Sequence, residues 1–422
     1  MNLFPIAALA GRLGGALGVA REQHVLAGST RGNALLPSRL SPTGPAHPPQ
    51  QYPVVDVNIT IHQTNVSLLP SPLPPAGPAS HADEIIDQFL RLTRSTSWKL
   101  VEKVPFEGDT FEPEGLVRFG NGERYLVSAG EWTAPRPRCA VSTQTPQEAP
   151  RKATEVGGNC MSAGAGAGIP HLLVFDRQGA RVADMTLVHP PGEDAEYHPG
   201  GIDYDGTYVW LPLAQYRPAS TATVLRLRVK TSQDEFPQVE PVLRVEEHIG
   251  AVAHDTSADQ KLLGLTWGGR AALSWRLQRR RWWCPWCRRA FSPPPVFTRP
   301  DRTVRNPSHF VDYQDCKFLG RSWRHGLRPV MLCSGIASLE DMNGGGEDGG
   351  TKTEIGGVAL VDMESMIPLW EVPLTMRTDR GALMTKNPMD VAVVNARMRL
   401  YFLPDERNST LYGYEPVLER SE

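Results

Sequence analysis

The sequence predicts an all-β protein: a β-propeller of five blades, with six as the alternative, accompanied by one short N-terminal helix. Three observations predict this fold. A short motif recurs five times, short apolar runs lie between turn residues, and no strands alternate with long amphipathic helices. Recurrence of one supersecondary unit is typical of propellers, and the lack of strand–helix alternation disfavours a parallel βαβ sheet.

The recurring motif is a polar residue, then proline or isoleucine, two mostly small or polar residues, and an apolar residue that opens a strand-like run. Its copies are Glu112-Pro113-Glu114-Gly115-Leu116, His198-Pro199-Gly200-Gly201-Ile202, His248-Ile249-Gly250-Ala251-Val252, Asn306-Pro307-Ser308-His309-Phe310 and Asn387-Pro388-Met389-Asp390-Val391. Successive copies begin 86, 50, 58 and 81 residues apart. A four-stranded blade takes roughly 40–50 residues, so the two middle intervals each fit one blade.

Before the propeller, three segments are predicted. Residues 1–20 have the outline of a weak signal peptide, although the stretch before the apolar run has no basic residue. Residues 21–80 are Pro-rich and without periodicity, which predicts a disordered leader. Residues 81–97 begin with a helix whose apolar face packs on the propeller, and the face consists of Ile85, Ile86, Phe89, Leu90 and Leu92.

The propeller itself is predicted over residues 98–418. Leu225, Leu227 and Val229 alternate with Arg226 and Arg228, the period of a half-buried strand. Only about 30 residues follow the fifth motif, too few for a blade of roughly 40–50 residues. We therefore expect the strand at 98–106 to complete the last blade and close the ring, which removes exposed sheet edges. Insertions are predicted at 131–168, 279–300 and 336–354.

Composition limits the classes of partner. The net charge of −2 argues against nucleic acid, and no apolar run approaches the roughly 18 residues of a membrane span. Sequons at Asn58, Asn65 and Asn408 favour a secreted glycoprotein, with a cytoplasmic location as the alternative. Cys316 and Cys333 flank one predicted hairpin and are candidate disulfide partners.

Two further cysteine pairs lie in the predicted insertions. Cys139 and Cys160 are placed to staple the first insertion, and free thiols are the alternative for both this pair and Cys316–Cys333. Cys284 and Cys287 form a C-x-x-C pair within a run of arginine and tryptophan. No second metal half-site and no βαβ unit accompany it, so we expect a surface insertion, and a misread intron is the alternative.

The motif's first residue is the candidate functional position. Stacking five repeats around an axis brings Glu112, His198, His248, Asn306 and Asn387 into one ring at the channel mouth. Carboxylate, amide and imidazole groups can hold a divalent cation, calcium or zinc. The alternatives are a mouth that binds a small molecule or glycan without catalysis, and polar caps with a structural role only.

Residues near the ring are secondary candidates. Glu114, His309, Asp390 and Asp203 can supply a base or support the metal ligands. The run from Asp312 to Asp315 is instead expected near the far end of an inner strand, where acidic side chains usually make turn hydrogen bonds.

Several segments carry a family resemblance, namely HPGGIDYDG (198–206), NPSHFVDYQDCKFLG (306–320), MLCSG (331–335) and LYFLPDERNSTLYGYEP (400–416). Over residues 98–416 the chain resembles a family of uncharacterised, mostly fungal proteins known only as a domain of unknown function. The polar ring more distantly resembles that of lactonase and arylesterase propellers, whose axial Glu, Asn, Asn and Asp residues hold a divalent cation. This resemblance implies a metal held by Glu112, Asn306 and Asn387, and Asp390 is a further candidate metal ligand. The two histidines of the ring depart from that pattern and weigh against calcium.

The first functional hypothesis is therefore a metal-dependent hydrolase of the lactonase or esterase type. Its site is the channel mouth, and His198, His248 or His309 carries the proton. The alternatives are a non-catalytic propeller that binds a ligand or partner, and a scaffold whose ring is structural.

Overall fold

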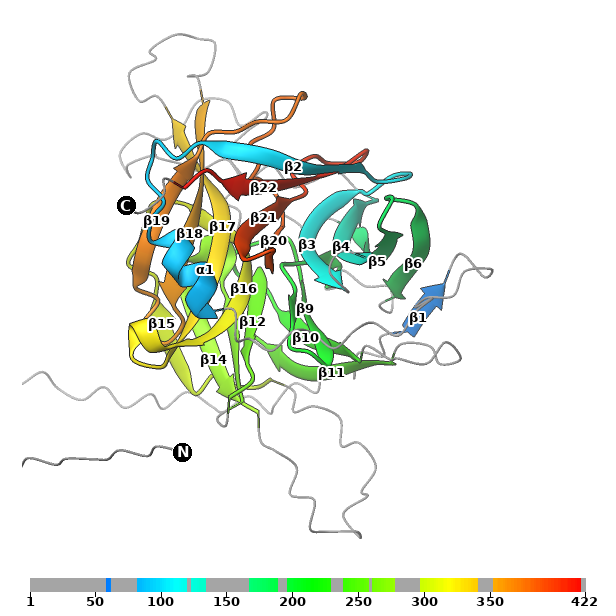
Figure 1. Ribbon diagram of the computed structural model, residues 1–422. Coiled ribbons are helices and arrows are strands. Elements are labelled where there is room, and N and C mark those ends of the chain that lie inside the picture. Colours follow the sequence, from blue (N-terminus) through cyan, green and yellow to red (C-terminus); the bar gives the residue numbers. More distant parts are fainter. Residues whose placement is uncertain are drawn as a thin grey trace, which may run out of the picture. The chain divides into compact units, whose positions relative to one another are not determined.

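The structure is a computed structural model that describes residues 58–61, 82–119, 123–133, 167–188, 196–228, 238–257, 260–277, 297–340 and 352–418. All of these residues belong to the second of two compact units, Gln51–Glu422. Within this unit the strands form five sheets arranged around an axis, so the predicted five-bladed β-propeller is confirmed (Figure 1). The predicted signal peptide, most of the leader and most of the three insertions lie outside the described residues.

The first two blades are antiparallel sheets of five strands each. The first blade contains, from axis to edge, β3 (Glu112–Phe119), β4 (Arg124–Trp132), β5 (Gly168–Asp176), β6 (Arg181–Val188) and β1 (Asn58–Ile61). The second contains β7 (His198–Pro199) and β8 (Asp203–Tyr204) next to β9 (Tyr208–Ala214), then β10 (Ala222–Arg228) and β11 (Gln238–Val245). β1 lies inside the stretch for which the sequence predicts a disordered leader, and it pairs with β6.

The other three blades have four strands each. The third contains β12 (Ala251–Asp255), β13 (Lys261–Leu265), β14 (Ala271–Arg276) and β15 (Arg302–Arg305). The fourth contains β16 (Asp312–Ser322), β17 (Arg328–Glu340), β18 (Lys352–Asp362) and β19 (Pro368–Leu374). The fifth contains β20 (Met389–Val394), β21 (Arg397–Phe402), β22 (Thr410–Pro416) and β2 (Trp98–Pro105).

The ring closes as the sequence predicts. β2 pairs antiparallel with β22, so that Trp98 lies opposite Pro416 and Pro105 opposite Thr410. The N-terminal strand thus completes the C-terminal blade, and in Figure 1 the cyan β2 lies beside the red β22. This pairing covers the sheet edge that the last blade would otherwise expose.

The hydrophobic core is divided among the five interfaces between neighbouring blades. The clearest example joins blades one and two, where Val117, Leu172 and Met185 pack against Leu211 and Leu225. Apolar clusters of the same kind join blades two and three, three and four, four and five, and five and one. Because a blade between two neighbours buries both of its faces, central strands such as β4 and β9 are largely buried along their length.

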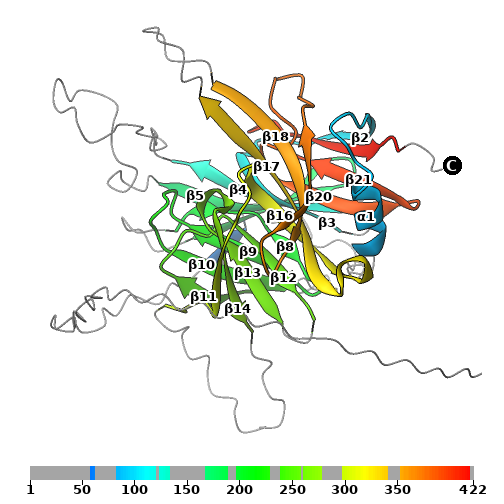
Figure 2. The same cartoon turned by 90° about the vertical axis from the view of Figure 1, so that its left-hand side faces the viewer.

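The single described α-helix, α1 (Ala82–Phe89), covers the interface between blades four and five (Figure 2). Ile85, Ile86, Phe89 and Leu92 are buried there as predicted, whereas Leu90 is 40% exposed. None of the helices in the described part of the chain is long and apolar enough to span a bilayer.

The predicted cross-strand cysteine pair is confirmed. Cys316 of β16 lies directly opposite Cys333 of β17, and the two form a disulfide inside blade four. The other four cysteines, Cys139, Cys160, Cys284 and Cys287, lie outside the described residues.

Candidate functional site at the channel mouth

Two positions in each blade meet at the same end of the channel. In an antiparallel blade, the start of the inner strand and the end of the second strand lie side by side. A residue at the start of the inner strand or shortly before it therefore lies near the loop between the second and third strands. In blade one these two positions are Glu112 and Trp132, and in blade two they are His198 and Tyr216. In blade three they are His248 and Trp267.

Glu112, Glu114 and His198 form a three-residue cluster, here called the mouth triad. One potential ligand atom from each lies within 4.8 Å of the others. His198 Nε2 is 3.2 Å from Glu114 Oε1, and Glu112 accepts a hydrogen bond from the indole Nε1 of Trp132. That bond fixes the orientation of the Glu112 carboxylate, as supporting residues do for metal ligands.

A β-bulge places Glu114 in the mouth triad. The pairing of β3 with β4 shifts between Pro113 and Gly115, so Glu114 has no residue opposite it. Bulges of this kind re-aim a side chain and are common beside functional sites. Gly115 makes the close approach to blade two possible, because a Cβ there would lie 2.6 Å from the backbone nitrogen of Ile202.

Four partly or fully buried aromatic residues surround the triad, here called the aromatic wall: Trp132, Tyr197, Tyr216 and Trp267. The Trp132 ring centroid is 4.9 Å from that of Tyr216 and 5.5 Å from that of Tyr197, and Tyr216 is 5.1 Å from Trp267. The His198 ring is 4.8 Å from that of Tyr216. The wall is apolar with polar edges, the composition of a small-molecule site.

His248 is next to the triad but is buried among aromatic residues. Its ring centroid is 6.2 Å from that of His198 and 4.8 Å from that of Trp267, and only 3% of the residue is exposed. Burial, with the His198 charge as the second cause, lowers the pKa of His248 to about 3. Its Nδ1 is 3.0 Å from the backbone oxygen of Gln215, so Nδ1 carries the hydrogen of a neutral ring.

The two asparagines of the predicted ring bind loop carbonyls instead. Asn306 Nδ2 donates to the oxygen of Gly269 at 3.0 Å, and Asn387 Nδ2 donates to that of Pro404 at 3.1 Å. His248 makes the same kind of bond, so three of the five motif residues hold a loop that joins the second and third strands of a blade. This shared contact explains why the motif needs a polar residue there.

The remaining predicted residues form hydrogen bonds with groups outside the mouth triad. His309 is exposed and its Nδ1 is 3.0 Å from Arg270 Nη1. Asp390 accepts the backbone N–H groups of Arg118 and Val391, both at 2.8 Å, and faces the channel interior. The ligand and proton-carrier roles predicted for Asn306, Asn387, Asp390 and His309 remain predictions.

The channel interior holds a buried charged group, the axial cluster of Asp203, Asp315, Lys317 and Asp390. Lys317 Nζ is 2.8 Å from both carboxylate oxygens of Asp315 and also donates to the carbonyl of Ile202. Burial raises the pKa of Asp315 to about 7 and that of Asp203 to about 6, although the Lys317 charge opposes both shifts. Burial also raises the pKa of Asp390.

The axial cluster connects the blades through their backbones. Asp315 Oδ2 accepts the N–H groups of Leu116 in blade one and Met389 in blade five, at 3.4 and 3.3 Å. Asp203 of blade two accepts the N–H of His254 in blade three at 2.9 Å. Asp315 lies near the start of the inner strand β16 and at the centre of the propeller, so the expectation that it lies near the far end of an inner strand is wrong.

Sequence reasoning missed both the aromatic wall and Lys317. Trp132, Tyr216 and Trp267 share no motif, because their loops differ in length and sequence. Their common signal is positional, since each lies at the end of the second strand of its blade or two residues beyond it. Lys317 and Asp315 are two apart on β16 and share a face, a pattern that also fits an ordinary half-buried strand.

The chain is therefore a five-bladed propeller, and the mouth triad with its aromatic wall is its candidate site. Residues 151–420 match the family of unknown function DUF6454, so the chain belongs to that family. No curated protein matches the chain.

Comparison with solved structures finds a mannose phosphorylase from Leishmania mexicana (10% identity, 80% of this chain, 93% of that chain, TM-score 0.35). It also finds a sialidase from Trypanosoma rangeli (9% identity, 70% of this chain, 43% of that chain, TM-score 0.33). A third is the WD40 domain of coronin from Toxoplasma gondii (10% identity, 78% of this chain, 88% of that chain, TM-score 0.26). These are similarities to the chain and carry no argument about its activity.

Proposed function

We propose that the protein is a metal-dependent hydrolase of esters or lactones, whose cation is held by the mouth triad. The observation that carries the proposal is the grouping of two carboxylates and one imidazole within 4.8 Å at the channel mouth. Catalytic zinc sites typically use three protein ligands and keep a further position for water or substrate, whereas structural sites use four.

The ligand set favours zinc over calcium. His198 offers a nitrogen ligand, whereas calcium takes oxygen ligands, six to eight of them. Glu112 and Glu114 supply negative charge, and the indole of Trp132 holds Glu112 in place. When bound, the cation would acidify a water molecule and polarise the substrate carbonyl.

The other residues bind and position the substrate in this proposal. The aromatic wall provides apolar contact for the body of an ester or lactone. His248 is a weak base at a pKa of about 3, so it acts as a positioning residue that fixes the loop carrying Tyr216. His248 thereby differs from the proton carrier that the sequence suggests.

A metal titration tests the proposal. Purified protein is treated with chelator, titrated with Zn²⁺ by calorimetry and assayed with aryl esters and lactones. We expect one Zn²⁺ per chain and turnover that needs it, both lost in Glu114→Gln. The matched control is Glu123→Gln, an exposed carboxylate in the turn at the other end of β3. Absence of stoichiometric zinc in the wild type would contradict the proposal.

A second candidate is a non-catalytic propeller that binds a small molecule or glycan at the mouth. The aromatic wall favours it, because tyrosine and tryptophan combine an apolar body with a polar edge. Quenching of tryptophan fluorescence by oligosaccharides, without turnover of any ester or lactone, would favour this candidate.

We also propose that the protein is secreted. The Cys316–Cys333 disulfide is typical of oxidising compartments. Asn408 of the third sequon is exposed in the loop between β21 and β22, where a glycan would have room.

A further inference from the structure

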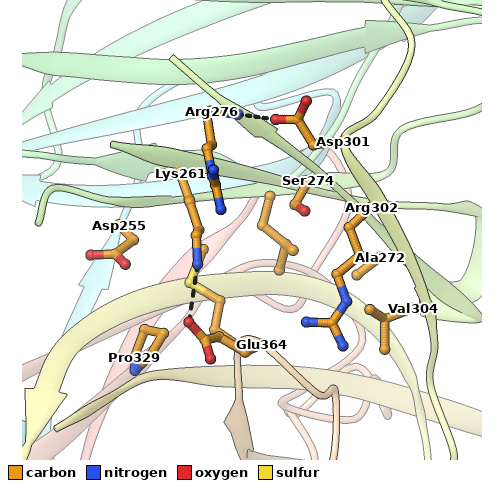
Figure 3. A pocket seen from close by; sticks show the side chains of 12 residues that line it. Asp255, Lys261, Ala272, Ser274, Arg276, Asp301, Arg302, Val304, Pro329 and Glu364 are labelled. Carbon is orange, nitrogen blue, oxygen red and sulfur yellow. Dashed lines mark hydrogen bonds and ion pairs between the residues drawn. The ribbon is translucent and has the colours of Figure 1, made fainter. Parts of the chain in front are cut away.

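A pocket of about 250 Å³ lies between blades three and four, away from the channel mouth (Figure 3). Its floor is apolar and consists of Leu263, Ala272, Val304, Pro329 and Met363. The first three belong to blade three and the last two to blade four. The pocket is therefore an outward continuation of the apolar interface that joins these blades.

Strand register places a row of cationic side chains along this pocket. Lys261 lies opposite Arg276 in the pairing of β13 with β14, and Ser274 lies opposite Arg302 in the pairing of β14 with β15. Because side chains alternate between the two faces of a sheet, these positions share the face that looks toward blade four. Figure 3 shows Lys261 and Arg302 extending from blade three toward the chain of blade four.

The acidic residues at the pocket already have partners. Asp255 is 2.7 Å from Arg321 Nη2 and accepts the N–H of Ser257. Glu364 is 3.0 Å from Lys261 Nζ, and Asp301 accepts the backbone N–H of Arg276 at 2.7 Å. Asp255 and Glu364 are therefore paired with cations of the protein, and Asp301 accepts a backbone N–H.

The two arginines differ from these acids. Among the described residues, the guanidinium groups of Arg276 and Arg302 have no hydrogen bond or ion pair. Both are exposed at the mouth of a pocket that also presents the Ser274 hydroxyl. Guanidinium groups bind carboxylate and phosphate in a planar, two-bond geometry.

We infer that this pocket binds a small organic anion, one that carries a carboxylate or phosphate group on an apolar body. The apolar body contacts the floor, and the anionic group lies between Arg276 and Arg302 with the Ser274 hydroxyl as a further donor. The volume limits the ligand to a small molecule. This site is independent of the mouth triad and of any metal.

Ligand-observed NMR and calorimetry with defined probes test the inference on the full chain. The probes are phenyl phosphate, benzoate, inorganic phosphate and uncharged benzyl alcohol. We expect phenyl phosphate or benzoate to bind, inorganic phosphate to bind more weakly, and benzyl alcohol to bind weakest. Tighter phenyl phosphate marks the ligand as a phosphate ester, and tighter benzoate marks it as a carboxylate.

Arginine variants give the second arm. Arg276→Gln and Arg302→Gln should each weaken binding of the charged probe about tenfold, the usual effect of losing a charge-assisted hydrogen bond. Arg305→Gln is the matched control, because Arg305 is exposed on the same strand but on its other face. Binding that is equal in all three variants, or no binding of either organic anion at millimolar concentration, would overturn the inference. Glu114→Gln should leave this binding unchanged, which separates this site from the proposed hydrolase.

Discussion

Substitution of His248 by asparagine should make the protein less sensitive to acid. The folded protein holds this imidazole neutral, because burial lowers its pKa from 6.5 to about 3. The unfolded chain binds a proton on His248 below about pH 6.5, whereas the folded chain does so only near pH 3. Unfolding is therefore favoured as the pH falls through that window, and the stability contributed by the neutral ring is complete only above pH 6.5.

The magnitude follows from the two pKa values. A pH of 5 is about 1.5 units below the pKa of histidine in the unfolded chain, and each unit corresponds to about 1.4 kcal/mol. Acidification to pH 5 therefore lowers the free energy of unfolding by about 2 kcal/mol. Asparagine does not titrate. It can donate to the Gln215 carbonyl as Asn306 and Asn387 donate to theirs, so the loop keeps its hydrogen bond.

Urea unfolding followed by tryptophan fluorescence at pH 8 and pH 5 measures the effect. Between pH 8 and pH 5, the free energy of unfolding should fall by about 2 kcal/mol more in the wild type than in His248→Asn. Thr303→Ala is the control, because this exposed side chain does not titrate and its loss should leave the pH dependence as in the wild type. Equal losses in the wild type and His248→Asn would refute the reasoning, since they would mean that His248 is not held neutral.

Three further variants test other features. Lys317→Met removes the cation beside the buried Asp315 carboxylate and should destabilise the protein by about 3–5 kcal/mol at pH 8 in urea unfolding. The loss of stability should be smaller at pH 5, because Asp315 has a pKa raised to about 7 and is protonated there. A loss of stability that does not depend on pH would contradict this account. Ala396→Gly should raise stability by about 1 kcal/mol in thermal unfolding, because Ala396 has φ 59° in the β20–β21 turn and glycine adopts this conformation without strain. A lower stability of the variant would show that alanine is not strained at this position. In protein made through a secretory pathway, Asn408→Gln should remove a glycosidase-sensitive mass seen by mass spectrometry, and an unchanged mass would contradict glycosylation at this sequon.

The architecture was predictable because each blade begins with a recognisable motif. The two middle motif intervals match one blade each, and the shortage of chain after Asn387 indicated that the strand at 98–106 completes the ring. Such a motif can be recognised in a sequence because its residue types specify a turn and the start of a strand. β1 was missed, since four residues in a Pro-rich stretch have too little pattern to indicate pairing.

The site was predictable only where the motif itself carries it. Glu112, His198 and His248 lie together because the motif position faces the mouth in three adjacent blades. Glu114 depends on a bulge whose register is visible only when β3 is paired with β4. Predicting that Lys317 lies in the axial cluster requires knowing which face of β16 is turned toward the axis. The alternation of side chains along one strand does not distinguish its two faces.

The pairing of β2 with β22 has a consequence for synthesis. On the ribosome β2 emerges before the inner strand of any blade, yet its partner is among the last strands to be made. Until then β2 has no hydrogen-bonded neighbour, and the growing ring presents an open sheet edge that can pair with other chains. The final blade therefore assembles only after nearly all of the propeller has been translated. A chain stopped short of β22 would keep two unsatisfied edges, which makes premature termination a direct route to aggregation.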